Sequence, residues 1–231
     1  GTNEARWLPA VAPQLSLPGP VPVVVGAPAA GFPFPWTVVP YLPGRSLAAD
    51  LLAPDAVATL TSFLVALHVP APVDAPRNPV RGIPLAERDE LTRERLVQLA
   101  GEIDAASLGA VWEEALAAPP FGRPPMWCHG DLHPGNLLVS DDGALAGVID
   151  FGDICCGDPA VDLSVAWLAL DATGRSALRD GVDDAAWLRA RGWALSLALA
   201  YLAHSADAPH MATIARRALA AVLDTTTDPH R

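Results

Sequence analysis

One stretch of the chain, from Trp127 to Asp153, constrains the fold more than any other. It begins W-C-H-G-D-L-H-P-G-N-L-L-V and, after a polar turn, ends G-V-I-D-F-G-D. The turn signal S-D-D-G at 140–143 separates two short apolar runs, at 137–139 and 144–149, which is typical of a β-hairpin. Such a hairpin would bring Asn136 and Asp150 side by side at its open end.

The spacing of the polar residues in this stretch is that of a kinase catalytic loop. His129 and Asp131 give H-x-D, Asn136 follows, and D-F-G begins at Asp150. In kinases the first Asp receives the hydroxyl proton, while the Asn and the D-F-G Asp hold magnesium, which prefers oxygen ligands. The pattern predicts Asp131 as catalytic base and Asn136 and Asp150 as magnesium ligands. The alternative is a polar loop between two ordinary strands, with Asp and Asn present for turn chemistry.

Together with G-D-P-A-V-D-L at 157–163, these motifs resemble the aminoglycoside phosphotransferase family of protein-kinase-like small-molecule kinases. The segment Y-L-P-G-R-S-L at 41–47 is similar to the linker between the two lobes in that family. The resemblance covers most of the chain, and its specific part is 128–163. It implies an α+β, protein-kinase-like two-lobe fold. Residues 1–45 would be the remnant of a small, β-containing lobe with the linker, and residues 46–231 a larger, mainly helical lobe with the catalytic loop and acceptor site.

The resemblance also implies an activity, which is transfer of the γ-phosphate of ATP or GTP, with Mg²⁺, to a hydroxyl of a small molecule. Family members act on aminoglycosides, macrolides, choline, homoserine and sugar amines, so the family does not identify the acceptor. The family binds adenine through the backbone after its second small-lobe strand. The corresponding residues here are Val39, Tyr41 and Leu42, for which a simple linker turn is the alternative reading.

Other polar residues in the motifs are given supporting roles. His129 is expected to pack against the catalytic loop and orient it, and His133 to contact phosphate or hold the loop. Asp153 and Asp158 are expected to accept backbone hydrogen bonds and cap helices rather than to bind metal. Asp162, at the start of the next helix, is expected to orient the loop.

A missing residue type departs from the family pattern: all 15 basic residues are arginine, and there is no lysine. Kinases pair a small-lobe lysine with a helix glutamate to hold the α- and β-phosphates. Glu4 lies where that glutamate is expected, and the lysine strand would precede Gly1. A truncated gene, a trimmed chain and a sequence restricted to ordered residues would each explain such a start. The alternative function is a degenerate or truncated kinase-fold protein that binds ligand without turnover.

Composition narrows the choice of partners. The net charge of −11 and the pI near 4.8 argue against nucleic-acid and anionic-membrane surfaces, and mildly favour a cationic acceptor. No apolar run approaches the roughly 18 residues that span a bilayer, and no signal peptide is visible. Of the three cysteines, Cys155 and Cys156 are adjacent and awkward to bridge and Cys128 lies next to the catalytic loop, so a reducing, cytoplasmic location is expected; the lack of C-x-x-C spacing argues against a zinc or thioredoxin-like site. The oligomeric state is left open.

A metal hydrolase is the third hypothesis. It uses His129-x-Asp131-x-His133 with Asp150 as a transition-metal site, but leaves Asn136 and the D-F-G unexplained.

Hydrophobic periodicity predicts strands at 21–26 and 36–39. It predicts helices at 4–12, at 47–67 with a restart at Pro54, and at 85–103, 105–117, 160–170, 184–204 and 211–223.

Overall fold

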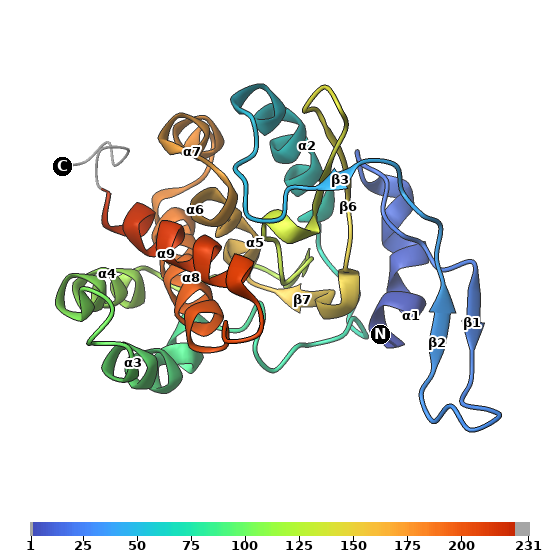
Figure 1. Ribbon diagram of the computed structural model, residues 1–231, viewed down its shortest axis with the longest axis horizontal. Coiled ribbons are helices and arrows are strands. Elements are labelled where there is room, and N and C mark those ends of the chain that lie inside the picture. The colour runs from blue at the N-terminus through green and yellow to red at the C-terminus, as the bar shows by residue number, and fades with distance from the viewer. Residues whose placement is uncertain (1, 225–231) are drawn as a thin grey trace.

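A computed structural model describes residues 2–224. A helical body surrounds helix α8, and helix α1 with a β-hairpin lies at one end of the molecule (Figure 1). The α-helices are α1 (Thr2–Val11), α2 (Val57–Leu67), α3 (Asp89–Gln98), α4 (Ala105–Ala117), α5 (Ala160–Leu163), α6 (Val165–Ala169), α7 (Ala172–Arg179), α8 (Asp184–Ala203) and α9 (Pro209–Leu223). The strands are β1 (Val24–Gly26), β2 (Trp36–Val38), β3 (Arg45–Ser46), β4 (Met126–Cys128), β5 (Leu137–Val139), β6 (Leu145–Val148) and β7 (Cys155–Gly157).

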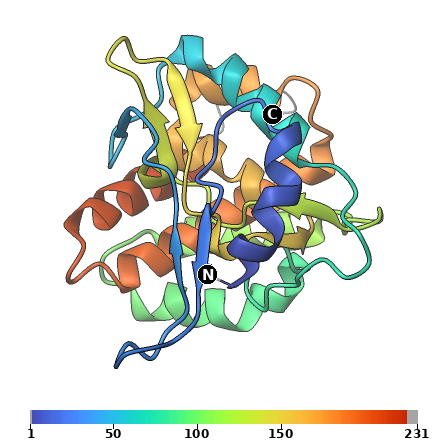
Figure 2. The same ribbon diagram turned by 90° about the vertical axis from the view of Figure 1, so that its right-hand side faces the viewer.

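The end of the molecule formed by α1, β1 and β2 is only partly integrated with the helical body. Helix α1 packs against it through the fully buried Leu8 and through Trp7, whose ring lies 5.4 Å from that of Trp127. Strands β1 and β2 pair antiparallel, with Val24 opposite Val38, and project away from the body (Figures 1 and 2). Because most apolar side chains of this hairpin remain exposed, this end is anchored to the core by α1 and by the segment after it, where Leu17 is buried and the Pro18 carbonyl accepts the Val148 N–H at 3.2 Å.

Two small sheets place the motif residues. In the first, β5 lies between β3 and β6, with Ser46 opposite Leu138 and Leu137 opposite Val148. In the second, β4 pairs with β7, the strands that precede the H-x-D motif and follow the D-F-G motif respectively. The two motifs are therefore held together by strand pairing on both sides.

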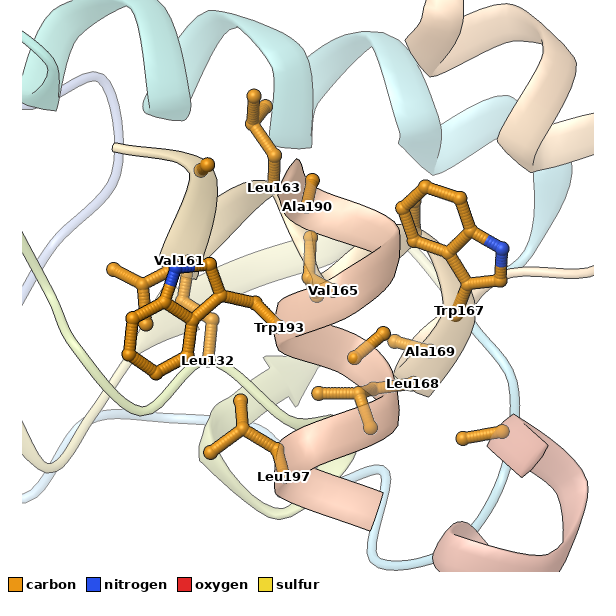
Figure 3. Packing of buried hydrophobic residues seen from close by; sticks show 14 of the residues in the cluster. Leu132, Val161, Leu163, Val165, Trp167, Leu168, Ala169, Ala190, Trp193 and Leu197 are labelled. Carbon is orange, nitrogen blue, oxygen red and sulfur yellow. The ribbon is translucent and has the colours of Figure 1, made fainter. Parts of the chain in front are cut away.

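The core of the large body is built on α8, which is buried along most of its length and packs against α4, α5 and α9. Trp193 in α8 is fully buried and lies beside Val161 of α5 and Leu132 of the catalytic loop (Figure 3). Leu132 follows the predicted base directly and is 1% exposed. The catalytic loop is therefore anchored in the core by its own apolar residue.

The predicted helix at 105–117 and the predicted hairpin of β5 and β6 are confirmed. The helices predicted at 184–204 and 211–223 are also confirmed, with ends that differ by at most two residues. The helix predicted at 47–67 is wrong in its first half. Leu47 donates its N–H to the Leu137 carbonyl, and Ala48 has a φ of 54°, which no α-helix accommodates. A 3₁₀ turn at Pro54–Ala56 precedes α2.

Two other helix predictions needed correction. The segment at 85–103 forms a 3₁₀ turn (Leu85–Arg88) followed by α3, which ends at Gln98. The helix at 160–170 is interrupted at Ser164, whose hydroxyl donates to the Val161 carbonyl at 2.6 Å and so competes with the helical ladder. Helix α7 was not predicted. Its sequence signal is the N-cap Asp171, which accepts the Gly174 N–H at 2.7 Å.

No helix between residues 2 and 224 combines the length and the apolar character that crossing a membrane would require.

Candidate active site

The base of the β5–β6 hairpin joins the two motifs. The Ile149 N–H donates to the Asn136 carbonyl at 3.0 Å, which places Asp150 next to Asn136 at the open end of the hairpin. The prediction that the hairpin joins these two positions is confirmed. Asn136 ends a short 3₁₀ turn (Pro134–Asn136), so its side chain is set by rigid backbone on both sides.

A buried carboxylate holds the catalytic loop from behind. Asp162 is fully buried and accepts the N–H groups of His129 and Gly130, each at 2.8 Å. His68 Nε2 lies 3.1 Å from the same carboxylate. Gly130 has a φ of 88°, and a Cβ there would lie 2.7 Å from the Asp153 carbonyl oxygen. The loop needs glycine at this position because both its backbone conformation and its packing exclude a side chain.

His129 links the catalytic loop to the D-F-G segment. Its Nε2 lies 3.0 Å from the Ile149 carbonyl, and its Nδ1 accepts the Asp131 N–H at 3.3 Å. Its ring packs against Phe151 at 4.6 Å. Both ring nitrogens are therefore engaged by protein, which leaves none for a metal. Within residues 2–224, no group of three or more His, Cys, Asp or Glu side chains could hold a metal, so the hydrolase hypothesis finds no support.

The Asp131 carboxylate lies between three side chains. Its Oδ1 accepts the Tyr201 hydroxyl at 3.0 Å and the Nη2 of Arg81 at 3.3 Å, and its Oδ2 lies 3.7 Å from His133 Nε2. Burial, followed by the charge of Asp131, raises the pKa of Tyr201 well above its usual value, so the hydroxyl stays a donor. The Asp131 side chain is 24% exposed, so the carboxylate is both fixed and reachable.

His133 faces the same carboxylate as a neutral ring. Its Nδ1 accepts the Gly135 N–H at 3.1 Å, which leaves the proton on the Nε2 that faces Asp131. Burial lowers the pKa of His133, and the opposing attraction of Asp131 is smaller. The ring is therefore neutral at neutral pH, and its Nε2 faces the Asp131 carboxylate without a hydrogen bond to it.

Asn136 and Asp150 present oxygen atoms suited to a hard cation. Asn136 Nδ2 donates to the Asp131 carbonyl at 2.9 Å, so its Oδ1 is the atom left for a ligand. Asp150 is exposed, has a left-handed backbone (φ 61°, ψ 63°), and accepts one long hydrogen bond, from the Gly152 N–H at 3.4 Å. One amide oxygen and one carboxylate fit the preference of Mg²⁺ for few protein ligands alongside phosphate oxygens.

A cleft of about 590 Å³ opens beside Asp150. Its lining includes the three predicted nucleotide-binding residues, Val39, Tyr41 and Leu42, together with Glu4 and Asp150. Leu138 and Ile149 of the β5–β6 hairpin add apolar surface. Residues predicted separately from the linker, the first helix and the D-F-G motif thus share one cavity. A second cavity, of about 490 Å³, lies behind the catalytic loop against His68 and Arg189, and none of the predicted catalytic or metal-binding residues line it.

The two aspartates predicted to cap helices differ in their partners. Asp158 accepts the Ala160 N–H at 3.0 Å, as predicted, and also binds Arg189 Nε at 2.7 Å in a buried ion pair. The prediction for Asp153 is wrong. Its carboxylate accepts Asn78 Nδ2 at 2.9 Å and lies 3.6 Å from Arg81 Nε, so its partners are side chains of a distant loop.

Several residues of the site were not found from the sequence, namely Arg81 and Asn78 from the loop before α3, Tyr201 from α8, and His68 after α2. Arg81, Asn78 and Tyr201 belong to no recognisable motif, and the sequence indicates no role for His68. Their hydrogen bonds to the motif residues span 50 or more positions in the sequence.

The fold and the site define a protein-kinase-like α+β architecture. The chain matches the sequence profile of the phosphotransferase enzyme family over residues 2–195. It is 31% identical to an aminoglycoside 3'-phosphotransferase of Escherichia coli over 144 residues, which are 58% of this chain and 52% of that protein. The chain thus spans about half the length of the curated relatives it matches.

Solved structures agree on the fold. One is the GDP and kanamycin complex of APH(2")-IIIa, with a TM-score of 0.67 and 22% identity, covering 95% of this chain and 80% of that one. Another is a thermostable mutant of aminoglycoside phosphotransferase APH(4)-Ia with AMP-PNP and hygromycin B, with a TM-score of 0.61 and 17% identity, covering 96% and 82%. The chain belongs to the phosphotransferase enzyme family.

Proposed function

We propose that this protein transfers the γ-phosphoryl group of ATP or GTP to a hydroxyl of a small molecule, with Mg²⁺. The observation that carries the proposal is the arrangement around the hairpin base. Asp131 faces outward from a fixed loop, and the Asn136 amide is oriented by its bond to the Asp131 carbonyl. Asp150 borders the cleft that contains the linker residues. Membership of the family and the nucleotide complexes of the solved relatives support it.

The chemistry assigned to the residues is simple. Asp131 accepts the proton of the acceptor hydroxyl while the oxygen of that hydroxyl forms a bond to the γ-phosphorus. The bond from that phosphorus to the bridging oxygen breaks, and its electron pair leaves on the nucleoside diphosphate. Asn136 and Asp150 would hold Mg²⁺, which supplies positive charge to the phosphate oxygens. Val39, Tyr41 and Leu42 would bind the base of the nucleotide, and Glu4 would border its phosphates.

The acidic chain and the names of the relatives make aminoglycosides the first acceptors to screen, because a net charge of −11 attracts cationic molecules. A reducing, cytoplasmic setting belongs to the same proposal and is supported by three free, buried cysteines. The division into residues 1–45 and 46–231 also remains a proposal.

The test is calorimetric titration of the 231-residue chain with Mg-ATP and Mg-GTP. Asp150→Asn should weaken nucleotide affinity by more than about tenfold, which is ~1.4 kcal/mol. Asparagine tolerates the left-handed backbone at this position, so the change removes charge without adding strain. Asp141→Asn, at the far turn of the same hairpin, is the matched control and should bind normally. Equal affinity in the wild type and Asp150→Asn would contradict the assignment. Absence of nucleotide binding by the wild type would contradict the proposed function, and binding without phosphoryl transfer to the acceptor would favour the degenerate alternative.

A further inference from the structure

An arginine from outside both motifs bridges them. Arg81 lies in the segment between α2 and α3, which passes beside β7 (Figure 1). Its Nη2 donates to Asp131 Oδ1 at 3.3 Å, and its Nε lies 3.6 Å from Asp153 Oδ2. The side chain is only 16% exposed. One guanidinium therefore contacts the predicted base and the residue directly after D-F-G.

The backbone that carries Arg81 is held closely against β7. The Asp158 N–H donates to the Gly82 carbonyl at 2.8 Å. A Cβ at Gly157 would lie 2.0 Å from that same carbonyl oxygen, so the approach is possible only with glycine. Asn78, three residues earlier, donates to the Asp153 carboxylate. The backbone that carries Arg81 is thus fixed by the fold, and the ion pairs then orient its guanidinium.

Most N–H groups of the Arg81 guanidinium make no hydrogen bond to the described residues 2–224. Among residues 2–224 its guanidinium makes one hydrogen bond, to Asp131, and its buried Nε makes none. An arginine carries five N–H groups in a planar fork that matches phosphate oxygens. Its charge is also felt nearby: burial, followed by the charges of Arg81 and Arg95, lowers the pKa of Arg88 to about 10. The charge of Arg81 therefore extends beyond its two carboxylate partners to Arg88.

We propose that Arg81 binds the phosphoryl group as it is transferred, an inference that rests on the proposed function. An acceptor hydroxyl that donates to Asp131 has its oxygen about 3 Å from the carboxylate, and the phosphorus lies about 3–3.5 Å beyond. A guanidinium 3.3 Å from that carboxylate reaches the equatorial phosphoryl oxygens. Positive charge at those oxygens is what a phosphoryl-transfer site requires, and Arg81 is the cation that the structure places against Asp131.

In this step Arg81 neither gains nor loses a proton. The acceptor proton passes to Asp131, the new oxygen–phosphorus bond forms, and the bond to the nucleoside diphosphate breaks. The guanidinium donates hydrogen bonds to the oxygens over which the negative charge is spread. Its contact with Asp131 keeps it beside the reacting atoms. A purely positioning role for Arg81, in which it only holds Asp131, is the alternative that the experiment must separate.

The experiment uses a probe that needs no acceptor. Mg-ADP is titrated into the 231-residue chain with and without aluminium fluoride, which occupies the place of the transferred phosphoryl group. The wild type should bind Mg-ADP more tightly with aluminium fluoride. Arg81→Gln should bind Mg-ADP itself within about twofold of the wild type, and its aluminium fluoride gain should fall by at least about tenfold. Arg93→Gln, the same change at an exposed arginine of α3, should keep the full gain.

Two comparisons make the result decisive. Tyr201→Phe removes the other donor to Asp131 Oδ1, so equal loss of the gain in Tyr201→Phe and Arg81→Gln would overturn the proposal in favour of a positioning role. Arg81→Lys keeps a positive charge beside both carboxylates and protects the fold, so it should retain more of the gain than Arg81→Gln; equal loss of the gain in these two variants would also overturn the proposal. A wild type that binds Mg-ADP, with a gain that Arg81→Gln retains, refutes this inference alone. A wild type that does not bind Mg-ADP refutes the proposed function as well.

Discussion

Replacing Asp162 by asparagine should destabilise the protein strongly, although Asp162 does not line the cleft. The carboxylate is fully buried and accepts two N–H groups of the catalytic loop, both at 2.8 Å, while His68 Nε2 lies 3.1 Å away. An asparagine has the same shape, so no cavity forms. Its single oxygen can accept from one loop N–H, and its NH₂ group must then face the other, as a donor against a donor.

The magnitude follows from these contacts. A hydrogen bond to a charged group contributes about 1.5–3 kcal/mol, and a buried N–H left without an acceptor costs about 1–3 kcal/mol. Part of this loss is offset because asparagine no longer has to bury a charge. The free energy of unfolding should therefore fall by about 2–4 kcal/mol. With a urea dependence of about 2 kcal/mol per molar, the urea midpoint should drop by about 1–2 M.

Urea denaturation followed by tryptophan fluorescence measures this change, because Trp193 lies in the core beside the catalytic loop (Figure 3). Asp104→Asn is the matched control. Asp104 accepts the Ser107 N–H at the start of α4, and asparagine caps helices as well as aspartate does, so its midpoint should hardly move. If Asp162→Asn unfolds within about 0.5 M of the wild type, Asp162 does not hold the loop and the reasoning is refuted.

Two further predictions concern the same loop. Gly130→Ala should lower the free energy of unfolding by about 1–3 kcal/mol more than Gly143→Ala. Both glycines have a φ near 88°, but only Gly130 has backbone within 4 Å of the added Cβ. Equal losses in urea denaturation would contradict the packing argument. His133→Gln should flatten the dependence of stability on acid pH. Burial lowers the pKa of His133 in the folded state, so the unfolded chain takes up the proton first, below about pH 6.5, and stability falls as the pH drops further. Unfolding free energies at pH 7 and pH 5 should therefore differ more in the wild type than in His133→Gln, and parallel losses would show that His133 contributes nothing.

The part of the site that could be predicted from the sequence is the part whose geometry is local. Asp131, Asn136 and Asp150 lie on one loop and one hairpin, so their spacing along the chain nearly determines their spacing in the fold. Arg81 and Tyr201 approach Asp131 from segments 50 and 70 residues away, and only tertiary packing brings them there. The proline-rich loop that carries Arg81 has no periodicity from which its position could be inferred.

The helices show the same limit. Residues 47–56 have apolar spacing that suits a helix. The start of this segment pairs with β5 instead, because the Leu47 N–H donates to the Leu137 carbonyl. Ser164 ends α5 through a hydrogen bond to its own chain, which a hydrophobic pattern does not reveal. Local propensity was overridden in the first case by a sheet partner and in the second by a side chain.

The exposed hairpin of β1 and β2 has a consequence for how the cleft and the core relate. A two-stranded ribbon that buries little apolar surface opens by local fluctuation at a small free-energy cost, whereas α8 is protected up to the global unfolding limit. Thr37 and Val39, which border the cleft, belong to or adjoin the ribbon, while Asp150 belongs to the protected core side. We therefore expect the two walls of the cavity to open at different free-energy costs, and we expect substitutions in the ribbon to change the opening of the cavity with little effect on the unfolding of the core.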